Sequence, residues 1–291
     1  MGERLGFVGL GKMGTPLTRN MLKDGHEVAG YDIDPERMRQ LQEAGGAPCE
    51  SAREVAERSD ITFTMLLKPE HIEENTTGPQ GVAAAGKRGL IHVEMSTMYP
   101  TWSAGLAGKL AGRGVEMLDA PVSGSVDQVH LRTLAFMVGG KREVFERVRP
   151  VIEPLARKTV YTGASGTGAT MKLATNLFVN AGVALLSESM LLAQRSGVPD
   201  GIIMEVLRGG TVGGNLLELA GPRILRRDFA PQGAVEIFVK DMGMAIDLAR
   251  ERGFELQVVK AAREMFIRAE KAGWKKDDAV RVVEVYEGKA G

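Results

Sequence analysis

The stretch Gly9-Leu10-Gly11-Lys12-Met13-Gly14 follows directly on the apolar run at residues 5–8. A turn of this kind between a strand and a helix is typical of a pyrophosphate site. The first glycine permits the tight turn, the second lets the backbone approach the phosphates, and the third lets helix and strand pack closely. We therefore predict a dinucleotide-binding βα unit whose residues 9–14 contact the cofactor.

A second apolar run, residues 27–31, ends at Asp32, about 20 residues past the glycines, where a carboxylate accepts hydrogen bonds from the adenosine ribose. The same charge repels a 2′-phosphate, and the next cation along the chain is Arg37, so we predict NAD rather than NADP. The alternative is that Asp32 caps a helix at residues 35–44. Asp34 fits that capping role better, because Pro35 suits the first helical position.

Composition excludes several classes of partner. The 37 basic residues of the 291-residue chain balance 37 acidic ones, so no net field attracts nucleic acid or an anionic membrane. We found no continuous apolar stretch of the roughly 20 residues that a membrane span needs, and no signal peptide, which predicts a cytoplasmic protein. Cys49 is the only cysteine, and the four histidines lack metal-ligand spacing, so we predict no metal site.

Short apolar runs alternate with helical periods over the first half of the chain, which is typical of a mostly parallel sheet. The expected strands are residues 4–8, 27–31, 61–66, 90–94, 116–118, 134–138 and 159–161. Beyond Gly168 only helical patterns follow, the first of them a long one at about residues 170–197. We predict an α/β fold with a doubly wound, Rossmann-type NAD-binding domain at residues 1–163. A long interdomain helix joins it to an all-α substrate and oligomerisation domain at residues 164–291.

Lys172 and Asn176 stand near the start of the long helix, and their i, i+4 spacing places them on one face. A lysine desolvated in a cleft can exchange a proton with an alcohol or carbonyl oxygen while a hydride moves to or from nicotinamide. The alternative from spacing alone is a lysine that faces solvent beside a polar neighbour.

Four motifs occur in order along the chain: the glycine turn at residues 7–14, Asp-Ala-Pro-Val-Ser-Gly at 119–124, Gly-x-x-Gly-x-Gly-x-x-x-Lys-x-x-x-Asn at 163–176, and Lys-Asp at 240–241. Together they span nearly the whole sequence. In this combination the chain resembles the β-hydroxyacid dehydrogenase family.

The resemblance implies a role for several further residues. It makes Lys172 the general acid and base, and Asn176 the residue that holds lysine and substrate. Ser123 and Gly124 would bind the substrate carboxylate, as consecutive N–H groups in a glycine turn can. It assigns cofactor contacts to Leu66, Leu67, Thr97 and Lys240. From the residues alone, three alternatives stay open: a plain loop at 119–124, a helix cap at Thr97 and a solvated charge at Lys240.

The chain also departs from the family pattern. Ser125 stands where a second glycine is usual, Leu67 where proline is common, Arg132 where glycine is common, and Thr175 where asparagine or histidine is common. Arg132 is either a second clamp for an anionic substrate or a surface arginine. These departures bear on which substrate is used rather than on hydride transfer.

The resulting hypothesis is an NAD-dependent oxidoreductase that interconverts a short, 3-hydroxyisobutyrate-like 3-hydroxy acid and its semialdehyde, with a small carboxylate-bearing substrate as partner. One alternative is an NADPH-dependent reductase of glyoxylate or succinic semialdehyde, which Asp32 opposes. An alternative from a different class is a module that binds a dinucleotide without catalysing a reaction. The presence of Lys172 and Asn176 argues against it. The resemblance also implies a homodimer or homotetramer.

Overall fold

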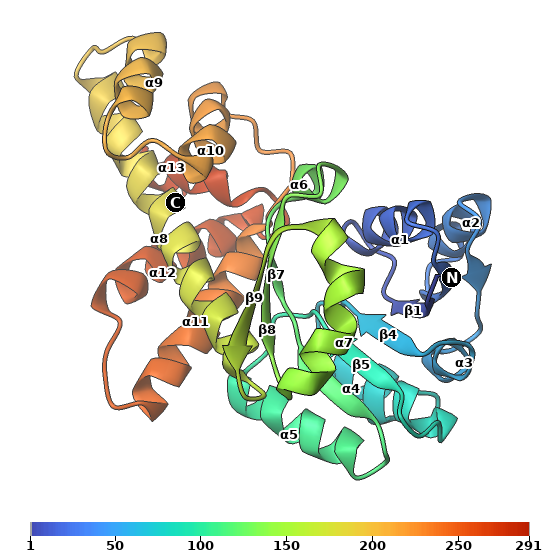
Figure 1. Ribbon diagram of the computed structural model, residues 1–291. Helices are drawn as coiled ribbons and strands as arrows, with labels where there is room; N and C mark the ends of the chain where they lie inside the picture. The colour runs from blue at the N-terminus through green and yellow to red at the C-terminus, as the bar shows by residue number, and fades with distance from the viewer. Residues whose placement is uncertain (1, 291) are drawn as a thin grey trace. The chain divides into compact units, whose positions relative to one another are not determined.

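The computed structural model describes residues 2–290, and over that range nine strands form one sheet in the order β3-β2-β1-β4-β5-β6-β8-β7, with β9 pairing to β8 (Figure 1). The strands are β1 (Arg4–Val8), β2 (Glu27–Tyr31), β3 (Ala47–Pro48), β4 (Ile61–Thr64), β5 (Ile91–Glu94), β6 (Glu116–Asp119), β7 (Val122–Ser123), β8 (Leu134–Gly139) and β9 (Ala156–Gly163). Strands β1 to β6 run parallel, whereas β8 is antiparallel to β6 and β7. The mostly parallel sheet predicted from the sequence is confirmed.

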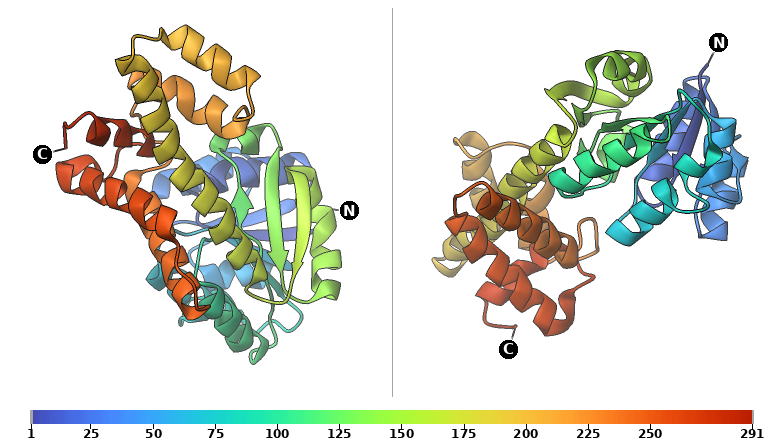
Figure 2. Two further views of the ribbon diagram at one scale, coloured as in Figure 1. Left: turned by 90° about the vertical axis from the view of Figure 1, so that its left-hand side faces the viewer. Right: turned by 90° about the horizontal axis from the view of Figure 1, so that it is seen from below.

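Helices cover both faces of this sheet, and every residue of the central strands β4 and β5 is buried (Figure 2). They are α1 (Gly14–Lys23), α2 (Pro35–Glu43), α3 (Ala52–Arg58), α4 (Pro69–Thr77), α5 (Pro100–Ala111), α6 (Val126–His130) and α7 (Arg142–Ile152), with short 3₁₀ turns η1 (Val82–Ala85) and η2 (Glu153–Leu155). One core lies against α1 and α7 and contains the stacked rings of Phe7 and Phe63, whose centroids are 6.0 Å apart. The other core lies against α3 and α5.

The chain divides into two compact units, one running up to Lys172 and the other beginning at Leu173. The second unit is helical, which confirms the predicted fold class. Its elements are the continuation of α8 (Thr167–Arg195), α9 (Asp200–Gly209), α10 (Asn215–Arg226), α11 (Val235–Glu251), α12 (Gln257–Ala269), η3 (Glu270–Trp274), η4 (Ala279–Arg281) and α13 (Val282–Tyr286). They surround a core of their own, in which Met190, Ile224, Met242 and Phe266 are fully buried.

Helix α8 corrects one expectation drawn from the sequence. Its 29 residues include an 18-residue window of mean hydropathy 1.4, so by length and composition it could cross a membrane. Polar residues, some of them consecutive as at residues 175–176 and 187–189, interrupt its apolar runs, which is why no such stretch was expected from the sequence. The same composition is found in core helices of globular proteins, and Val183, Ala184 and Met190 of α8 belong to the core of the second unit.

The start of α8 packs unusually close to the sheet. A Cβ atom placed on Gly168 would collide with the backbone carbonyl oxygens of Asp119 and Met137. Only glycine therefore fits at this point, where the helix meets the ends of β6 and β8.

We predict that Gly168→Ala lowers the free energy of unfolding by about 2 kcal/mol, because backbone rather than a flexible side chain would have to move. Gly105 is the matched control, since it is also helical, lies in α5 and has no atom within 4 Å of an added Cβ. Gly105→Ala should stabilise the protein by about 0.5–1 kcal/mol through helix propensity. Urea unfolding followed by circular dichroism measures both, and equal effects of the two substitutions would contradict the close packing.

Candidate active site

The glycine turn has the geometry that a pyrophosphate site requires. Gly9 has φ +94°, a value that disfavours any side chain, and a Cβ on Gly14 would collide with the carbonyl oxygen of Gly9. A Cβ on Gly11, in contrast, would meet no atom within 4 Å. The turn is therefore tight at its first glycine, open at its second and closely packed at its third, as the sequence predicted.

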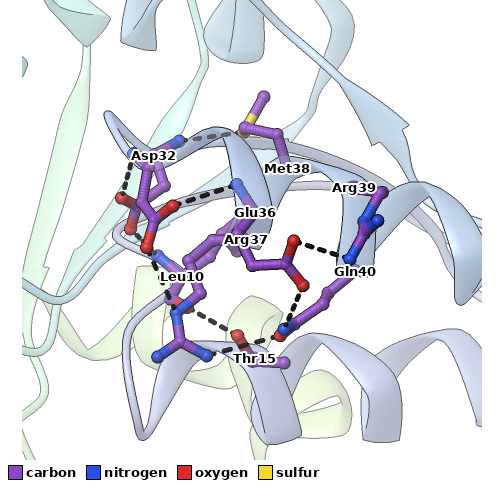
Figure 3. A network of polar contacts seen from close by, with 9 residues as sticks. Leu10, Thr15, Asp32, Glu36, Arg37, Met38, Arg39 and Gln40 are labelled. Atoms are coloured by element: carbon purple, nitrogen blue, oxygen red, sulfur yellow. Dashed lines mark hydrogen bonds and ion pairs between the residues drawn. The ribbon is translucent and has the colours of Figure 1, made fainter.

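Asp32 lies at the carboxyl end of β2 and faces this turn (Figure 3). Its Oδ2 accepts a hydrogen bond from the Leu10 N–H at 2.7 Å, and its Oδ1 accepts one from the Asp34 N–H at 2.9 Å. Asp34, not Asp32, is the N-cap of α2, since its side chain accepts the Glu36 N–H at 2.9 Å. The prediction for Asp34 is confirmed, and the capping alternative for Asp32 is wrong.

The loops that follow β4 and β5 are joined by a hydrogen bond. The Leu66 N–H donates to Ser96 Oγ at 2.9 Å, and the Ser96 N–H donates to the carboxylate of Glu94 at 2.8 Å. Leu67 is 71% exposed, whereas Thr97 is half-buried. Thr97 does not cap a helix, because the N-cap of α5 is Tyr99.

Asp119, at the end of β6, anchors the first turn of α8. Its Oδ1 accepts the Gly166 N–H at 2.8 Å, and its Oδ2 accepts the Ala169 N–H at 2.9 Å. The side chain is 2% exposed, and this burial raises the pKa of the carboxyl, while the backbone amides oppose the rise. A carboxylate at a helix N-terminus satisfies amides that have no partner within the helix.

Lys172 lies beside the loop that begins with β7. Its Nζ donates a hydrogen bond to the Val122 carbonyl oxygen at 2.7 Å, which places the ammonium group one residue from Ser123. Gly124 follows with φ +146°. The first unit therefore brings together Lys172 and the loop at residues 122–124, although Lys172 and Val122 are 50 residues apart in the sequence.

Ser125 and Arg132, two departures from the family pattern, have structural roles. Ser125 is the N-cap of α6, and its N–H donates to Gln128 Oε1 at 3.0 Å. Arg132 has φ +57°, and its guanidinium donates to Asp24 at 2.8 Å and to the Pro154 carbonyl at 3.3 Å. These bonds tie the end of α1 to η2, so the geometry favours a structural arginine over a substrate clamp.

In the second unit, Asn176 is held by Asp241, a residue of the Lys-Asp motif for which the sequence predicts no role. Asn176 Nδ2 donates to Asp241 Oδ2 at 2.7 Å, and Asp241 is 4% exposed. Lys240 Nζ lies 3.4 Å from the other carboxylate oxygen of Asp241. Asp241 fixes which end of the Asn176 amide is a donor, because an ionised carboxylate can only accept.

Sequence reasoning missed Asp119, Asp241, Glu94 and Ser96 as residues that hold the site together. Asp119 and Asp241 lie inside the motifs at residues 119–124 and 240–241. An acidic residue within a motif was the signal that could have identified them. Glu94 ends β5 and Ser96 directly precedes Thr97, and an acidic residue at the end of a buried strand was the signal there. Within residues 2–290, no three His, Cys, Asp or Glu side chains are grouped so that they could hold a metal ion.

Comparison with known protein families gives two matches that together cover almost the whole chain. Residues 4–163 match the NAD binding domain of 6-phosphogluconate dehydrogenase. Residues 166–286 match the NAD-binding domain of NADP-dependent 3-hydroxyisobutyrate dehydrogenase.

Individual proteins are similar over the same length. The chain is 32% identical to L-threonate dehydrogenase from Cupriavidus necator over 289 residues, which cover 99% of this chain and 97% of the relative. It is 34% identical to 2-hydroxy-3-oxopropionate reductase from Escherichia coli over 263 residues, 90% of each chain. A solved structure of 3-hydroxyisobutyrate dehydrogenase from Salmonella typhimurium superposes with a TM-score of 0.90 at 29% identity, covering 97% of this chain and 99% of that one.

We predict that Asp119→Asn lowers kcat by about 10-fold to 100-fold, because a small displacement of α8 moves Lys172 away from the substrate loop. The amide of asparagine offers one acceptor where the carboxylate offers two, so the substitution also lowers the melting temperature. Melting curves and steady-state turnover of nicotinamide cofactor measure the two effects.

Asp278→Asn is the matched control for this loss of stability. Asp278 is a buried aspartate of the second unit that accepts the Gln232 and Gly233 N–H groups at 2.8 and 2.9 Å. It should lower the melting temperature and leave kcat within about threefold of wild type, because it touches none of the site residues. Equal losses of kcat in both variants would show that Asp119 acts only through overall stability.

Proposed function

The chain belongs to the β-hydroxyacid dehydrogenase family of NAD(P)-dependent oxidoreductases, and from this premise we propose that it interconverts a short 3-hydroxy acid and its semialdehyde. We further propose NAD as the cofactor and Lys172 as the general acid and base. The observation that carries the proposal is the hydrogen bond from Lys172 Nζ to the Val122 carbonyl, beside Ser123 and Gly124.

The residues present fit a dinucleotide. The glycine turn is open at Gly11, where a pyrophosphate would approach the backbone, and Asp32 lies directly beside that turn. Each Asp32 oxygen accepts one backbone N–H and keeps a further lone pair for a ribose hydroxyl. When bound, the nicotinamide ring supplies or accepts the hydride.

The surroundings of Asp32 support NAD over NADP. Arg37 is the cation drawn beside Asp32 in Figure 3, and its guanidinium is engaged by Asp34 at 3.9 Å and by Gln40 at 3.3 Å. A 2′-phosphate would have to compete with these contacts and would meet the charge of Asp32. A ribose hydroxyl needs only an acceptor, which the carboxylate provides.

Ser123, Gly124 and Lys172 have complementary tasks in this proposal. The Ser123 hydroxyl and the Gly124 N–H bind the substrate carboxylate, which places the carbinol carbon, two bonds from the carboxylate carbon, near the lysine. In reduction Lys172 donates a proton from Nζ to the carbonyl oxygen, and in oxidation it takes the proton from the hydroxyl. The Val122 carbonyl orients Nζ before substrate arrives.

Asn176 lies one helical turn beyond Lys172, about 6 Å along the helix axis. Because its Nδ2 is committed to Asp241, its Oδ1 is left to accept a hydrogen bond. In the proposed reaction this oxygen accepts from the lysine ammonium or from the substrate hydroxyl. Asp241 is therefore a positioning residue in this proposal.

Self-association is part of the same proposal. Four apolar residues of α8 recur at seven-residue intervals on its exposed surface: Met171, Phe178, Leu185 and Leu192. Two helical turns separate successive members, so they form one stripe along the helix. A homodimer or homotetramer would cover an apolar stripe of this kind.

We predict that Lys172→Met lowers kcat by about 10²-fold to 10⁴-fold, the usual contribution of a general acid–base group, and leaves the NADH dissociation constant unchanged. Methionine keeps the apolar stem and removes the proton. The assay follows nicotinamide absorbance with 3-hydroxyisobutyrate, tartronate semialdehyde, L-threonate, succinic semialdehyde and glyoxylate. Lys141→Met is the control, because Lys141 forms a surface ion pair with Glu116 and should retain full activity. If Lys172→Met keeps more than about a tenth of the wild-type rate, the assignment fails.

We also predict that Asp32→Ser changes cofactor choice. The ratio of kcat/KM for NADH to that for NADPH should fall by at least about 10-fold, because a charge-assisted hydrogen bond to the ribose is lost and a repulsion is removed. Glu43→Ser is the control, since it removes an equal charge from the exposed last turn of α2, where Glu43 contacts Arg39 rather than Arg37. A wild-type preference for NADPH, or an equal shift in both variants, would contradict the role of Asp32.

A further inference from the structure

Glu94 is a fully buried carboxylate that the proposed reaction does not use. It ends β5 in the middle of the sheet and is 0% exposed, as is His92 two residues earlier. His92 Nε2 lies 3.6 Å from Glu94 Oε2, and His92 Nδ1 lies 3.1 Å from Thr62 Oγ1 on the neighbouring β4. Burying a carboxylate is costly unless hydrogen bonds compensate, so its partners indicate what it stabilises.

The hydrogen bonds made by Glu94 and by its partner Ser96 connect the sheet core to two loops. Glu94 Oε1 accepts the Ser96 N–H at 2.8 Å, which fixes the start of the loop after β5, residues 95–99. Ser96 is 3% exposed, and its Oγ accepts the Leu66 N–H at 2.9 Å, which fixes the loop after β4, residues 65–68. A single serine therefore connects two loops that come from adjacent strands.

The loop after β4 in turn lies against the glycine turn. A Cβ on Gly9 would collide with the Met65 carbonyl and would lie 2.9 Å from Leu66 Cδ2. Because atoms pack this closely around Gly9, the loop after β4 and the glycine turn have little freedom to move relative to each other. A continuous series of contacts thus runs from Glu94 through Ser96 and Leu66 to the first glycine of the phosphate-binding turn.

We propose that Glu94 and Ser96 are positioning residues for cofactor binding: they fix the loops after β4 and β5 and, through Leu66, the phosphate-binding turn at Gly9. This inference rests on the proposed function, together with the cofactor contacts that the family resemblance implies for Leu66 and Thr97. It assigns Ser96 an effect on cofactor affinity and none on proton transfer, because the Ser96 hydroxyl accepts its hydrogen bond from Leu66, whereas Lys172 is held by the Val122 carbonyl.

The test is Ser96→Ala, which removes the acceptor of the Leu66 N–H. We expect the NADH dissociation constant and the KM for NADH to rise by about fivefold, the typical effect of one lost hydrogen bond, with kcat at saturating NADH within about twofold of wild type. Ser96→Thr restores the hydroxyl and should restore the affinity. Ser96→Cys keeps the volume with a weak acceptor and should behave like the alanine variant.

Ser103→Ala is the matched control. Ser103 is a serine of α5 that is 0% exposed, and its Oγ has no hydrogen-bond partner among residues 2–290. Its N–H donates to the Tyr99 carbonyl at 2.9 Å, a backbone bond that alanine keeps. It should leave NADH affinity unchanged. If Ser96→Ala binds NADH as tightly as wild type, or if Ser103→Ala weakens binding equally, the inference is overturned. NADH binding is measured by fluorescence without substrate, so the result stands even if none of the tested acids is turned over. Absence of turnover would count against the proposed function alone.

Discussion

The arrangement of the site depends on the hydrogen bonds between Asp119 and the first turn of α8. Two backbone amides of that turn, from Gly166 and Ala169, point at one buried carboxylate on β6. The same strand leads within three residues to Val122, whose carbonyl receives Lys172 Nζ. The loop that contains Ser123 and Gly124 and the start of α8 are therefore fixed to each other through one side chain. Gly168 is necessary for this, because any larger residue would push the helix off the sheet.

Carboxylates accept hydrogen bonds from loop amides at two other places along the carboxyl edge of the sheet. Asp32 ends β2 and accepts the Leu10 N–H of the glycine turn, and Glu94 ends β5 and accepts the Ser96 N–H. Glu94 and Asp119 are direct neighbours in the register of β5 and β6. Each carboxylate satisfies the backbone of a loop that leaves the sheet at its ligand-binding edge. Rigid loops at this edge reduce the entropy that cofactor and substrate binding would otherwise cost.

Local patterns in the sequence predicted much of this structure. The glycine turn, the strands at residues 4–8 and 27–31, and the cap at Asp34 depend on neighbours within a few residues. Contacts between distant segments were not predictable in that way. The short strand β7 is too brief to show a period, and Asp119 receives amides that lie 47 and 50 residues further along the chain. Arg132 looked like a possible anion clamp because its partners Asp24 and Pro154 are distant in sequence.

The central claim is that this protein transfers a hydride between a nicotinamide cofactor and a small hydroxy acid whose carboxylate lies beside Lys172. The most direct measurement uses reduced cofactor deuterated at both nicotinamide C4 positions, with a semialdehyde substrate, and analyses the amount and the mass of the hydroxy acid formed by mass spectrometry. The account predicts that the hydroxy acid carries deuterium on its carbinol carbon, and that formation of this product is almost lost in Lys172→Met. An unlabelled product, or equal labelling by the Lys172→Met variant, would contradict it.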